Sequence, residues 1–339
     1  MTLSATHPAL QPSAAVSPEP IMKLASGFMA AKHLFAANEL GLFEALGDSP
    51  ATLDALAART GLTRRAARIS ADAMVALGLL QKDDETYRNG PEAAQFLAGR
   101  TPADLRPFLR FWDSISYPVW QNLAQALSSG PPSEIFDLDE GLQEIASAGI
   151  EAVLAGPARA LPQVHDFTAH SRLLDIGGGT GSWALAIAQQ NPHLQATIFE
   201  LPVVVGFANE RIAAAGLQAR VDAVVGDAMS GSLPEGYDVL LAANLLHYWS
   251  PEQIQAFLQR ARASVAPGTT LLLADFWTDP THTQPLHAAL MAGEFAVHIE
   301  HGDVYSVEEI RAWLIGTGWA FSEHVSLAGP QSVIVATAD

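Results

Sequence analysis

An acid and a run of glycines lie together in one short stretch, Asp-Ile-Gly-Gly-Gly-Thr-Gly, at residues 175–181. An apolar strand pattern precedes the stretch and an apolar helical pattern follows it, which predicts a turn between a strand and a helix. Glycines in such a turn let backbone N–H groups approach a ligand closely. The nicotinamide fingerprint places its glycines first, third and sixth, but the sixth residue counted from Gly177 is Ser182. The loop instead fits an acid followed by glycines at 177, 179 and 181.

The next two predicted strands also end in residues that could hold a nucleoside. Glu200 ends the apolar run Ile-Phe-Glu, where a carboxylate could bind the two hydroxyls of a ribose. Asp227 and Met229 follow in Gly-Asp-Ala-Met, where an adenine amine and an adenine face could lie. A cationic sulfonium suits an acidic pocket and needs no phosphate cradle. Together with a short hairpin at the end of the chain, these features resemble the class I methyltransferases that use S-adenosylmethionine.

The resemblance narrows to the plant-type and bacterial small-molecule O-methyltransferases. It covers residues 20–339, and the matching stretches are LLDIGGGTG, IFELP, GDAM, NLLHYW and LLLADFW. It implies a homodimer with intertwined N-terminal helices and a small-molecule substrate. It also implies a set of cofactor contacts: Asp175, Gly177, Gly179, Glu200, Leu201, Asp227 and Met229.

His247 follows the apolar run of the fourth predicted strand, at the edge where open parallel sheets bind their ligands. A single histidine at a strand end is usually structural. In the family that the chain resembles, the histidine at this place removes the proton of an acceptor hydroxyl as the methyl group transfers. Imidazole titrates near neutral pH, and general base catalysis contributes about 10²–10⁴-fold. Asp275 ends the fifth strand and matches a family carboxylate that orients the histidine.

Two residues depart from the family pattern. Tyr248 stands where an aspartate usually follows the histidine, and Val304 stands where a late Gly-x-Glu-Arg-Thr stretch supplies a second carboxylate. The departures leave a second chemistry open. In a minority branch that methylates α-keto acids at carbon, two histidines hold an iron or zinc ion that acts as a Lewis acid. His247 and His298 would be the two ligands here, and the sequence does not decide between this chemistry and O-methylation at a hydroxyl.

From Ser171 onward, apolar strands of about five residues alternate with helical patterns. This alternation predicts an α/β fold with helices on both faces of a parallel sheet, and two final strands joined by a short turn predict an antiparallel pair. The family resemblance implies a Rossmann-like, mostly parallel sheet of seven strands. These elements bring the glycine loop, the acids and His247 to one edge.

The region before residue 100 is mainly helical. Thr52 and Thr63 each precede an amphipathic helix, a turn at Gly61 lies between the helices, and a charged hairpin follows. This is the pattern of a winged helix, which either binds DNA through Arg64, Arg65 and Arg68 or serves dimerisation. Residues 50–100 hold seven basic and six acidic side chains, so no basic footprint favours a DNA-binding regulator.

The whole chain has 339 residues and a formal net charge of −18. The charge argues against binding to nucleic acid or to an anionic membrane, and the absence of cysteine excludes thiolate chemistry. Without a signal peptide or an apolar run of membrane-spanning length, we expect a soluble, cytoplasmic protein. The expected organisation is a flexible tail (1–19), a winged-helix dimerisation domain (20–103), a helical connector lining the substrate pocket (104–165) and an S-adenosylmethionine-binding domain (166–339).

Overall fold

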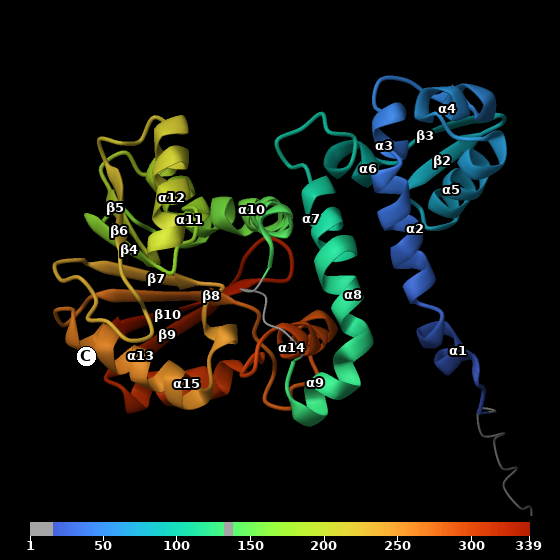
Figure 1. Ribbon diagram of the computed structural model, residues 1–339. Helices are drawn as coiled ribbons and strands as arrows, with labels where there is room; N and C mark the ends of the chain where they lie inside the picture. Colours follow the sequence, from blue (N-terminus) through green and yellow to red (C-terminus); the bar gives the residue numbers. More distant parts are fainter. Residues whose placement is uncertain (1–15, 132–137) are drawn as a thin grey trace, which may run out of the picture. The chain divides into compact units, whose positions relative to one another are not determined.

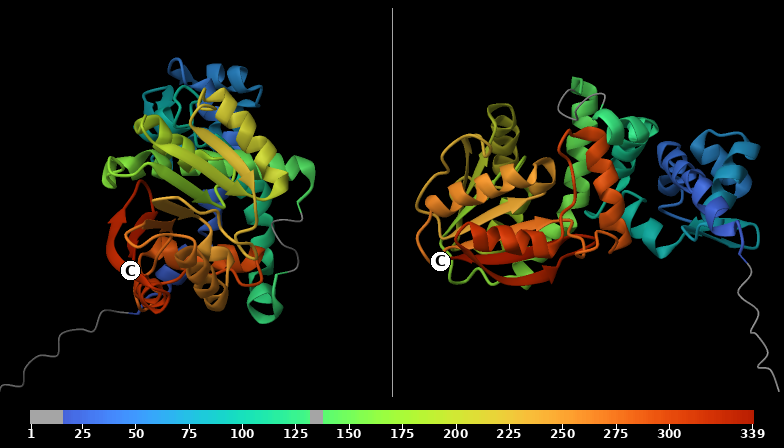
Figure 2. Two further views of the ribbon diagram at one scale, coloured as in Figure 1. Left: turned by 90° about the vertical axis from the view of Figure 1, so that its left-hand side faces the viewer. Right: turned by 90° about the horizontal axis from the view of Figure 1, so that it is seen from below.

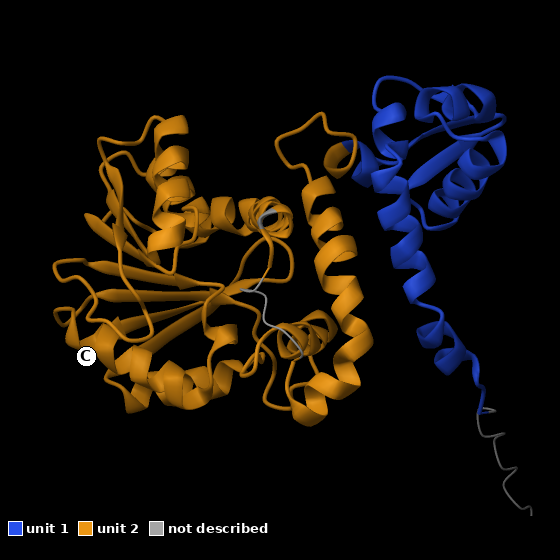
Figure 3. Cartoon of the chain, viewed as in Figure 1, with its two compact units in different colours: residues 1–94 blue, residues 95–339 orange. Residues whose placement is uncertain are grey.

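The computed structural model describes residues 16–131 and 138–339, and the chain divides into two compact units after Ala94 (Figure 3). Residues 1–15, most of the predicted tail, lie outside the described residues. Within the described ranges, no helix is both long enough and apolar enough to cross a membrane.

The first unit is a small helical domain with a three-stranded antiparallel sheet in the order β1-β3-β2. Its helices are α1 (Glu19–Ala25), α2 (Phe28–Glu39), α3 (Leu42–Ala45), α4 (Leu53–Thr60) and α5 (Arg64–Ala76), and the unit boundary falls within α6 (Pro91–Phe96). Its strands are β1 (Ala51–Thr52), β2 (Leu80–Asp83) and β3 (Thr86–Asn89).

The predicted winged helix is confirmed, down to its caps. The hydroxyl of Thr52 accepts a hydrogen bond from the N–H of Ala55 at 3.3 Å, and the hydroxyl of Thr63 accepts one from Ala66 at 3.2 Å. Each bond satisfies a donor that the first turn of a helix leaves free. Gly61 ends α4 at φ 69°, a left-handed conformation that glycine adopts without steric cost. The β2–β3 hairpin then forms the wing.

The second unit begins with helices in nearly continuous succession, drawn in green in Figure 1. They are α7 (Arg106–Phe111), a π-helix (Trp112–Ser116), α8 (Tyr117–Val119), a 3₁₀ turn (Trp120–Asn122), α9 (Leu123–Ser129) and α10 (Glu140–Val164). A π-helix of this kind changes the rotation of the residues that follow it, and such segments are frequent at functional sites.

The core of the second unit is a seven-stranded sheet in the order β6-β5-β4-β7-β8-β10-β9. Neighbours from β6 to β8 pair in parallel, whereas β10 pairs antiparallel with both β8 and β9, as predicted. The strands are β4 (Arg172–Ile176), β5 (Gln195–Glu200), β6 (Val221–Val225), β7 (Val239–Ala243), β8 (Thr270–Asp275), β9 (Trp319–Ser326) and β10 (Ser332–Ala338).

Helices cover both faces of this sheet (Figures 1 and 2). Alternate strand residues point to opposite faces, so Leu173 and Leu241 pack with α10, α11 (Ser182–Gln190) and α12 (Pro202–Ala214). Their neighbours Leu174 and Leu240 pack on the other side with α13 (Pro251–Ala263) and α15 (Val307–Gly316). Burial on both faces explains why the strands read as continuous apolar runs. The remaining helix, α14 (Leu286–His298), contacts α9 and the 3₁₀ turn at Trp120–Asn122.

The strand order reverses between β4 and β7, because the chain proceeds from β4 outward to β5 and β6 and then returns to the other side. In open parallel sheets, the crevice at the carboxyl ends of the strands on either side of such a point is the usual ligand site. The glycine loop follows β4 and the His247 turn follows β7, so the fold places both at this crevice.

Candidate active site

The glycine loop joins β4 to α11, and its three alternate glycines serve different purposes. Gly177, Gly179 and Gly181 adopt φ values of 65°, 56° and 90°, which favour glycine. A Cβ at Gly177 would lie 2.9 Å from a methyl of Leu245, and one at Gly181 would lie 2.5 Å from Ile198. A Cβ at Gly179 would meet no atom within 4 Å. Two glycines therefore allow tight packing, and Gly179 borders open space that a ligand could occupy.

Asp175 lies beneath the loop, with its carboxylate fully buried. It accepts a hydrogen bond from the N–H of Ala184 at 3.1 Å, and a Cβ on Gly178 would lie 2.7 Å from it. The pKa of Asp175 is raised to about 7, mainly by burial; the hydrogen bond from Ala184 opposes the rise and the nearby charge of Glu200 adds to it. The side chain thus supports the loop and the start of α11 from inside.

Glu200 is the last residue of β5, and Asp227 follows the end of the neighbouring strand β6. The carboxylate of Glu200 accepts from the N–H of Gly179 at 2.9 Å and from that of Leu201 at 2.7 Å. Asp227 accepts from the hydroxyl of Ser230 and the N–H of Met229, and these bonds lower its pKa in that order of importance. The structure therefore places the predicted acids at one edge, each held by backbone donors.

His247 is the centre of a buried pair. The strand β7 ends at Ala243, and Leu246–Tyr248 form a 3₁₀ turn that carries the imidazole, so the histidine does not end the strand itself. Its Nδ1 lies 2.7 Å from Oδ1 of Asp275, the last residue of β8, which also accepts from the N–H of Phe276 at 2.9 Å. His247 is 5% exposed and Asp275 2%, so the pair is shielded from water.

The segment around Val304, which departs from the family pattern, supports the His247 turn through its backbone and through the phenol of Tyr305. The N–H of Asp303 donates to the carbonyl of His247 at 3.1 Å, and the hydroxyl of Tyr305 donates to the carbonyl of Trp249 at 2.5 Å. Val304 is buried and packs with Phe295. The family pattern has a second carboxylate at the place of Val304, and no other carboxylate takes its place here. Within the described residues, Asp275 is the acid bonded to the imidazole.

Tyr248 borders the imidazole with its ring edge, at 4.3 Å between ring centroids. Burial raises the pKa of Tyr248 to about 12, and the charges of Asp275, Glu200 and Glu294 add to this effect. The phenol is therefore neutral at physiological pH.

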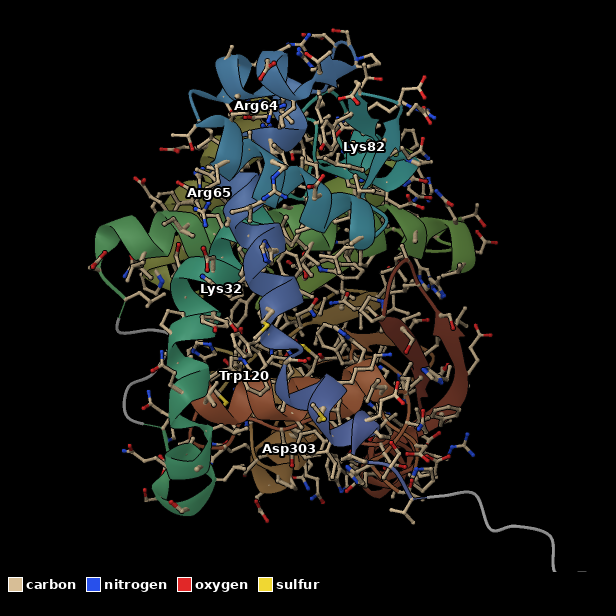
Figure 4. The ribbon with its side chains drawn as sticks, turned by 90° about the vertical axis from the view of Figure 1, so that its right-hand side faces the viewer. Lys32, Arg64, Arg65, Lys82, Trp120 and Asp303 are labelled. Atoms are coloured by element: carbon tan, nitrogen blue, oxygen red, sulfur yellow. The ribbon has the colours of Figure 1, made fainter. Side chains whose placement is uncertain are left out.

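Glu294 belongs to a polar cluster that the sequence pattern did not identify. It is 4% exposed, and its Oε2 accepts hydrogen bonds from the hydroxyl of Ser116 and the indole N–H of Trp120, both at 2.5 Å. Its Oε1 lies 3.2 Å from Nε2 of His298. Trp120 lies beside α14 in Figure 4. One sequence feature could have indicated the cluster: Glu294 and His298 lie four residues apart in an otherwise apolar helix. No sequence feature indicated Ser116, which lies 178 residues from Glu294.

The predicted metal pair of His247 and His298 finds no support. Of the residues that the structure describes, no three His, Cys, Asp or Glu side chains converge as a metal site. Nδ1 of His247 is hydrogen-bonded to Asp275, whereas Nε2 of His298 lies 3.2 Å from Oε1 of Glu294 without forming a hydrogen bond. The described residues therefore form no group of metal ligands beyond these two imidazoles.

The three arginines of the alternative DNA-binding hypothesis are exposed on α5, and Figure 4 shows Arg64 and Arg65 there. Arg64 pairs with Asp54 at 2.8 Å and Arg68 with Asp72 at 3.2 Å. Acidic partners cancel much of the charge that a phosphate backbone would need.

Comparison with known proteins gives a consistent result. Residues 133–320 match the model of an O-methyltransferase domain, and residues 22–99 match that of an O-methyltransferase dimerisation domain. The chain is 32% identical over 320 residues to the 3-hydroxy-5-methyl-1-naphthoate 3-O-methyltransferase of Streptomyces sahachiroi, covering 92% of each chain. It is 30% identical to the N,N-dimethyltransferase OxyT of Streptomyces rimosus, covering 88% of this chain and 90% of the relative. The apo structure of the S-adenosylmethionine-dependent methyltransferase SibL superposes with a TM-score of 0.81 at 30% identity, covering 95% and 99% of the two chains.

Proposed function

The chain belongs to the S-adenosylmethionine-dependent small-molecule O-methyltransferases, and we propose that it methylates a hydroxyl group with His247 as the general base. The observation that carries the proposal is the buried 2.7 Å contact between Nδ1 of His247 and Asp275 at the crevice of the sheet. One relative is named as a 3-O-methyltransferase of 3-hydroxy-5-methyl-1-naphthoate, which supports a small, hydroxylated aromatic acceptor here.

The carboxylate of Asp275 determines how the imidazole can act. It accepts only, so the proton of a neutral His247 lies on Nδ1 and the lone pair on Nε2. Nε2 can then take the proton of an acceptor hydroxyl that lies within hydrogen-bond distance. Asp275 also stabilises the charged imidazole that results, because the opposite charges lie 2.7 Å apart in a buried site.

The cofactor side of the crevice fits S-adenosylmethionine. Gly179 offers open space, and Glu200 and Asp227 present carboxylates at neighbouring strand ends. We assign Gly177, Leu201 and Met229 to the same site, as expected from the sequence, and assign the side chain of Asp175 to its support. S-adenosylmethionine, when bound, supplies a methyl group whose bond to sulfur breaks as the bond to the acceptor oxygen forms, with the electron pair leaving on sulfur. The protein contributes alignment of the acceptor with that methyl group.

Calorimetric titration with S-adenosylmethionine tests the cofactor assignment, and no binding at millimolar ligand would contradict it. The base is tested with His247→Gln and Asp275→Asn, assayed on hydroxynaphthoates and related phenols. We expect each variant to bind the cofactor normally and His247→Gln to lose about 10²–10⁴-fold in kcat. A His247→Gln enzyme with the wild-type rate would exclude the histidine as the base.

Metal-assisted methylation of an α-keto acid at carbon is the alternative. It would use Nε2 of His247 and Nδ1 of His298, since carboxylates face the other two ring nitrogens. A carboxylate behind an imidazole also orients metal ligands, so this arrangement alone does not discriminate. Elemental analysis of the protein with activity before and after chelation does: we expect no stoichiometric metal and an unchanged rate. One bound iron or zinc ion per chain, lost in His298→Ala, would favour the alternative.

A further inference from the structure

Phe295 covers one face of the His247 ring. The two rings are nearly parallel, with 9° between their planes and 3.8 Å between their centroids. Asp275 occupies the Nδ1 edge of the same imidazole, and Tyr248 meets it edge-on. The histidine is thus held from three sides, and one of its faces rests on an aromatic ring.

This stack changes in strength when His247 takes a proton. A neutral imidazole gains mainly packing from a benzene ring. A cation within about 6 Å of the ring centre is attracted in addition by the negative face of the aromatic ring, and more strongly when both are shielded from water. Phe295 is 8% exposed and His247 5%, so this stack is shielded. The aromatic face therefore favours the charged form of the histidine over the neutral form.

The neighbours of Phe295 fix its position. Gly293 allows the indole of Trp120 to approach α14, because a Cβ there would lie 3.1 Å from Cη2 of the indole. Glu294 accepts from Trp120 and Ser116. Two successive residues of α14 thus anchor this turn of the helix to the segment that contains the π-helix, and Phe295 follows them directly.

We propose that Phe295 is a positioning residue for the base, whose aromatic face stabilises the imidazolium that forms as methyl transfer proceeds. The proposal rests on the role of His247 proposed above. The neutral His247 that acts as the base becomes charged as it removes the acceptor proton, so the added attraction arises on the way to the transition state. Such differential stabilisation raises kcat and leaves cofactor binding unchanged.

Other groups also face the histidine, and the test must separate Phe295 from them. The titratable residues on the elements packed around this ring are Asp275 at the end of β8, Tyr248 in the same turn, His287, Glu294 and His298 on α14, and Glu300, His301, Asp303 and Tyr305 in the loop that bonds the His247 carbonyl. A substitution at Phe295 removes no charge, so it leaves the electrostatic contributions of this set in place.

The test compares Phe295→Leu, which keeps an apolar side chain without a ring, with Phe295→Tyr, which keeps the ring. Met291→Leu is the packing control, because Met291 lies in the same apolar cluster and makes no ring contact with His247. For Phe295→Leu we expect kcat to fall by about 2- to 30-fold on the pH plateau. We expect the acidic limb of the pH–rate profile to move down by about 0.5–1 pH unit, since the charged form loses its support.

A second readout does not require an acceptor. In the complex with S-adenosylhomocysteine, the Cε1 proton resonance of His247, assigned by its loss in His247→Gln, is titrated by NMR. We expect its midpoint to move to lower pH in Phe295→Leu and to return in Phe295→Tyr. A uniform loss of rate with no change in either pH midpoint, or failure of Phe295→Tyr to restore them, would overturn the proposal. Full activity of His247→Gln would instead refute the role of the histidine, which keeps the two failures distinct.

Discussion

At the scale of single residues, two aspartates of the cofactor crevice have opposite surroundings. Burial without enough hydrogen bonds raises the pKa of Asp175 to about 7. Hydrogen bonds from Ser230 and Met229 lower that of Asp227 at the surface of the same crevice. Residue type alone does not separate them. Asp175 therefore supports the shape of the glycine loop at a cost in folding stability. Asp227 remains ionised and could bind a ligand through its charge.

The raised pKa of Asp175 predicts a specific pH dependence of stability. The folded protein holds this proton up to about pH 7, whereas the unfolded chain releases it near pH ~3.9. Ionisation of the unfolded chain therefore lowers the free energy of unfolding of the wild type as pH rises from about 4 to 7. The variant Asp175→Asn lacks this loss, so we expect its stability relative to wild type to increase across that window and to level off above it.

Urea unfolding at intervals from pH 4 to 8 measures the effect. Asp222→Asn is the control, because Asp222 is exposed on β6 and its replacement should leave the pH dependence as in the wild type. A difference between Asp175→Asn and wild type that stays constant with pH would contradict the prediction.

At the scale of an element, the loop after β4 combines two demands on glycine. Gly179 and Gly181 both have positive φ, so alanine at either costs about 1–2 kcal/mol of backbone strain. Only at Gly181 would the added Cβ also meet a buried side chain, Ile198 at 2.5 Å. We therefore expect Gly181→Ala to unfold at a clearly lower temperature than Gly179→Ala.

The affinity for S-adenosylmethionine should show the reverse order, with Gly179→Ala more affected than Gly181→Ala when only folded protein is compared. Alanine at Gly179 projects into the open space assigned to the cofactor, and we expect at least about a tenfold loss of S-adenosylmethionine affinity by calorimetry. Equal affinity of Gly179→Ala and wild type would show that the cofactor does not approach this glycine.

A second element-scale feature is the anchoring of α14. The carboxylate of Glu294 is buried and depends on two donors, Ser116 and Trp120. Removing either donor in Ser116→Ala or Trp120→Phe should lower the free energy of unfolding by about 1–3 kcal/mol. Ser114→Ala in the same π-helix is the matched control, because Ser114 is exposed and surface changes stay within about 0.5 kcal/mol. A loss in the free energy of unfolding for Ser116→Ala as small as that of the control would contradict this anchoring role.

At the scale of the whole molecule, an apolar surface remains on the first unit. Ile21, Met22 and Leu24 of α1 are 66–82% exposed, and Phe28 and Met29 of α2 at least 50%. An exposed apolar stripe of this kind is typical of an oligomer interface. Since residues 22–99 match an O-methyltransferase dimerisation domain, we propose a homodimer formed through these helices.

Light scattering during size-exclusion chromatography should give about twice the mass of one chain. Leu24→Asp combined with Phe28→Asp should yield a monomer, because burial of two charges in an apolar interface is unfavourable. Leu77→Asp changes the C-cap residue of α5, which is 45% exposed, and it should leave the mass unchanged. A wild-type mass equal to one chain would contradict the dimer.

We also propose domain boundaries between residues 103 and 104 and between residues 165 and 166, which limited proteolysis can test.

The sequence by itself determined the features that depend on neighbouring residues. Periodicity predicted the alternation of strands and helices, cap residues predicted the starts of α4 and α5, and the spacing of glycines identified the loop after β4. Because parallel strands share one carboxyl edge, the same pattern also brought His247 and Asp275 to a common edge. Local chemistry and the rules of strand connection suffice for these predictions.

Only the tertiary structure decided how side chains distant in sequence meet. It placed the Asp175 carboxylate inside the loop, set Phe295 against the His247 ring, and joined Glu294 to Ser116 across 178 residues. The sequence pattern did not identify Glu294, and it offered His298 only as a metal ligand in an alternative chemistry. These contacts depend on the rotation of α14 and of the π-helix segment, which close packing fixes and local pattern does not encode.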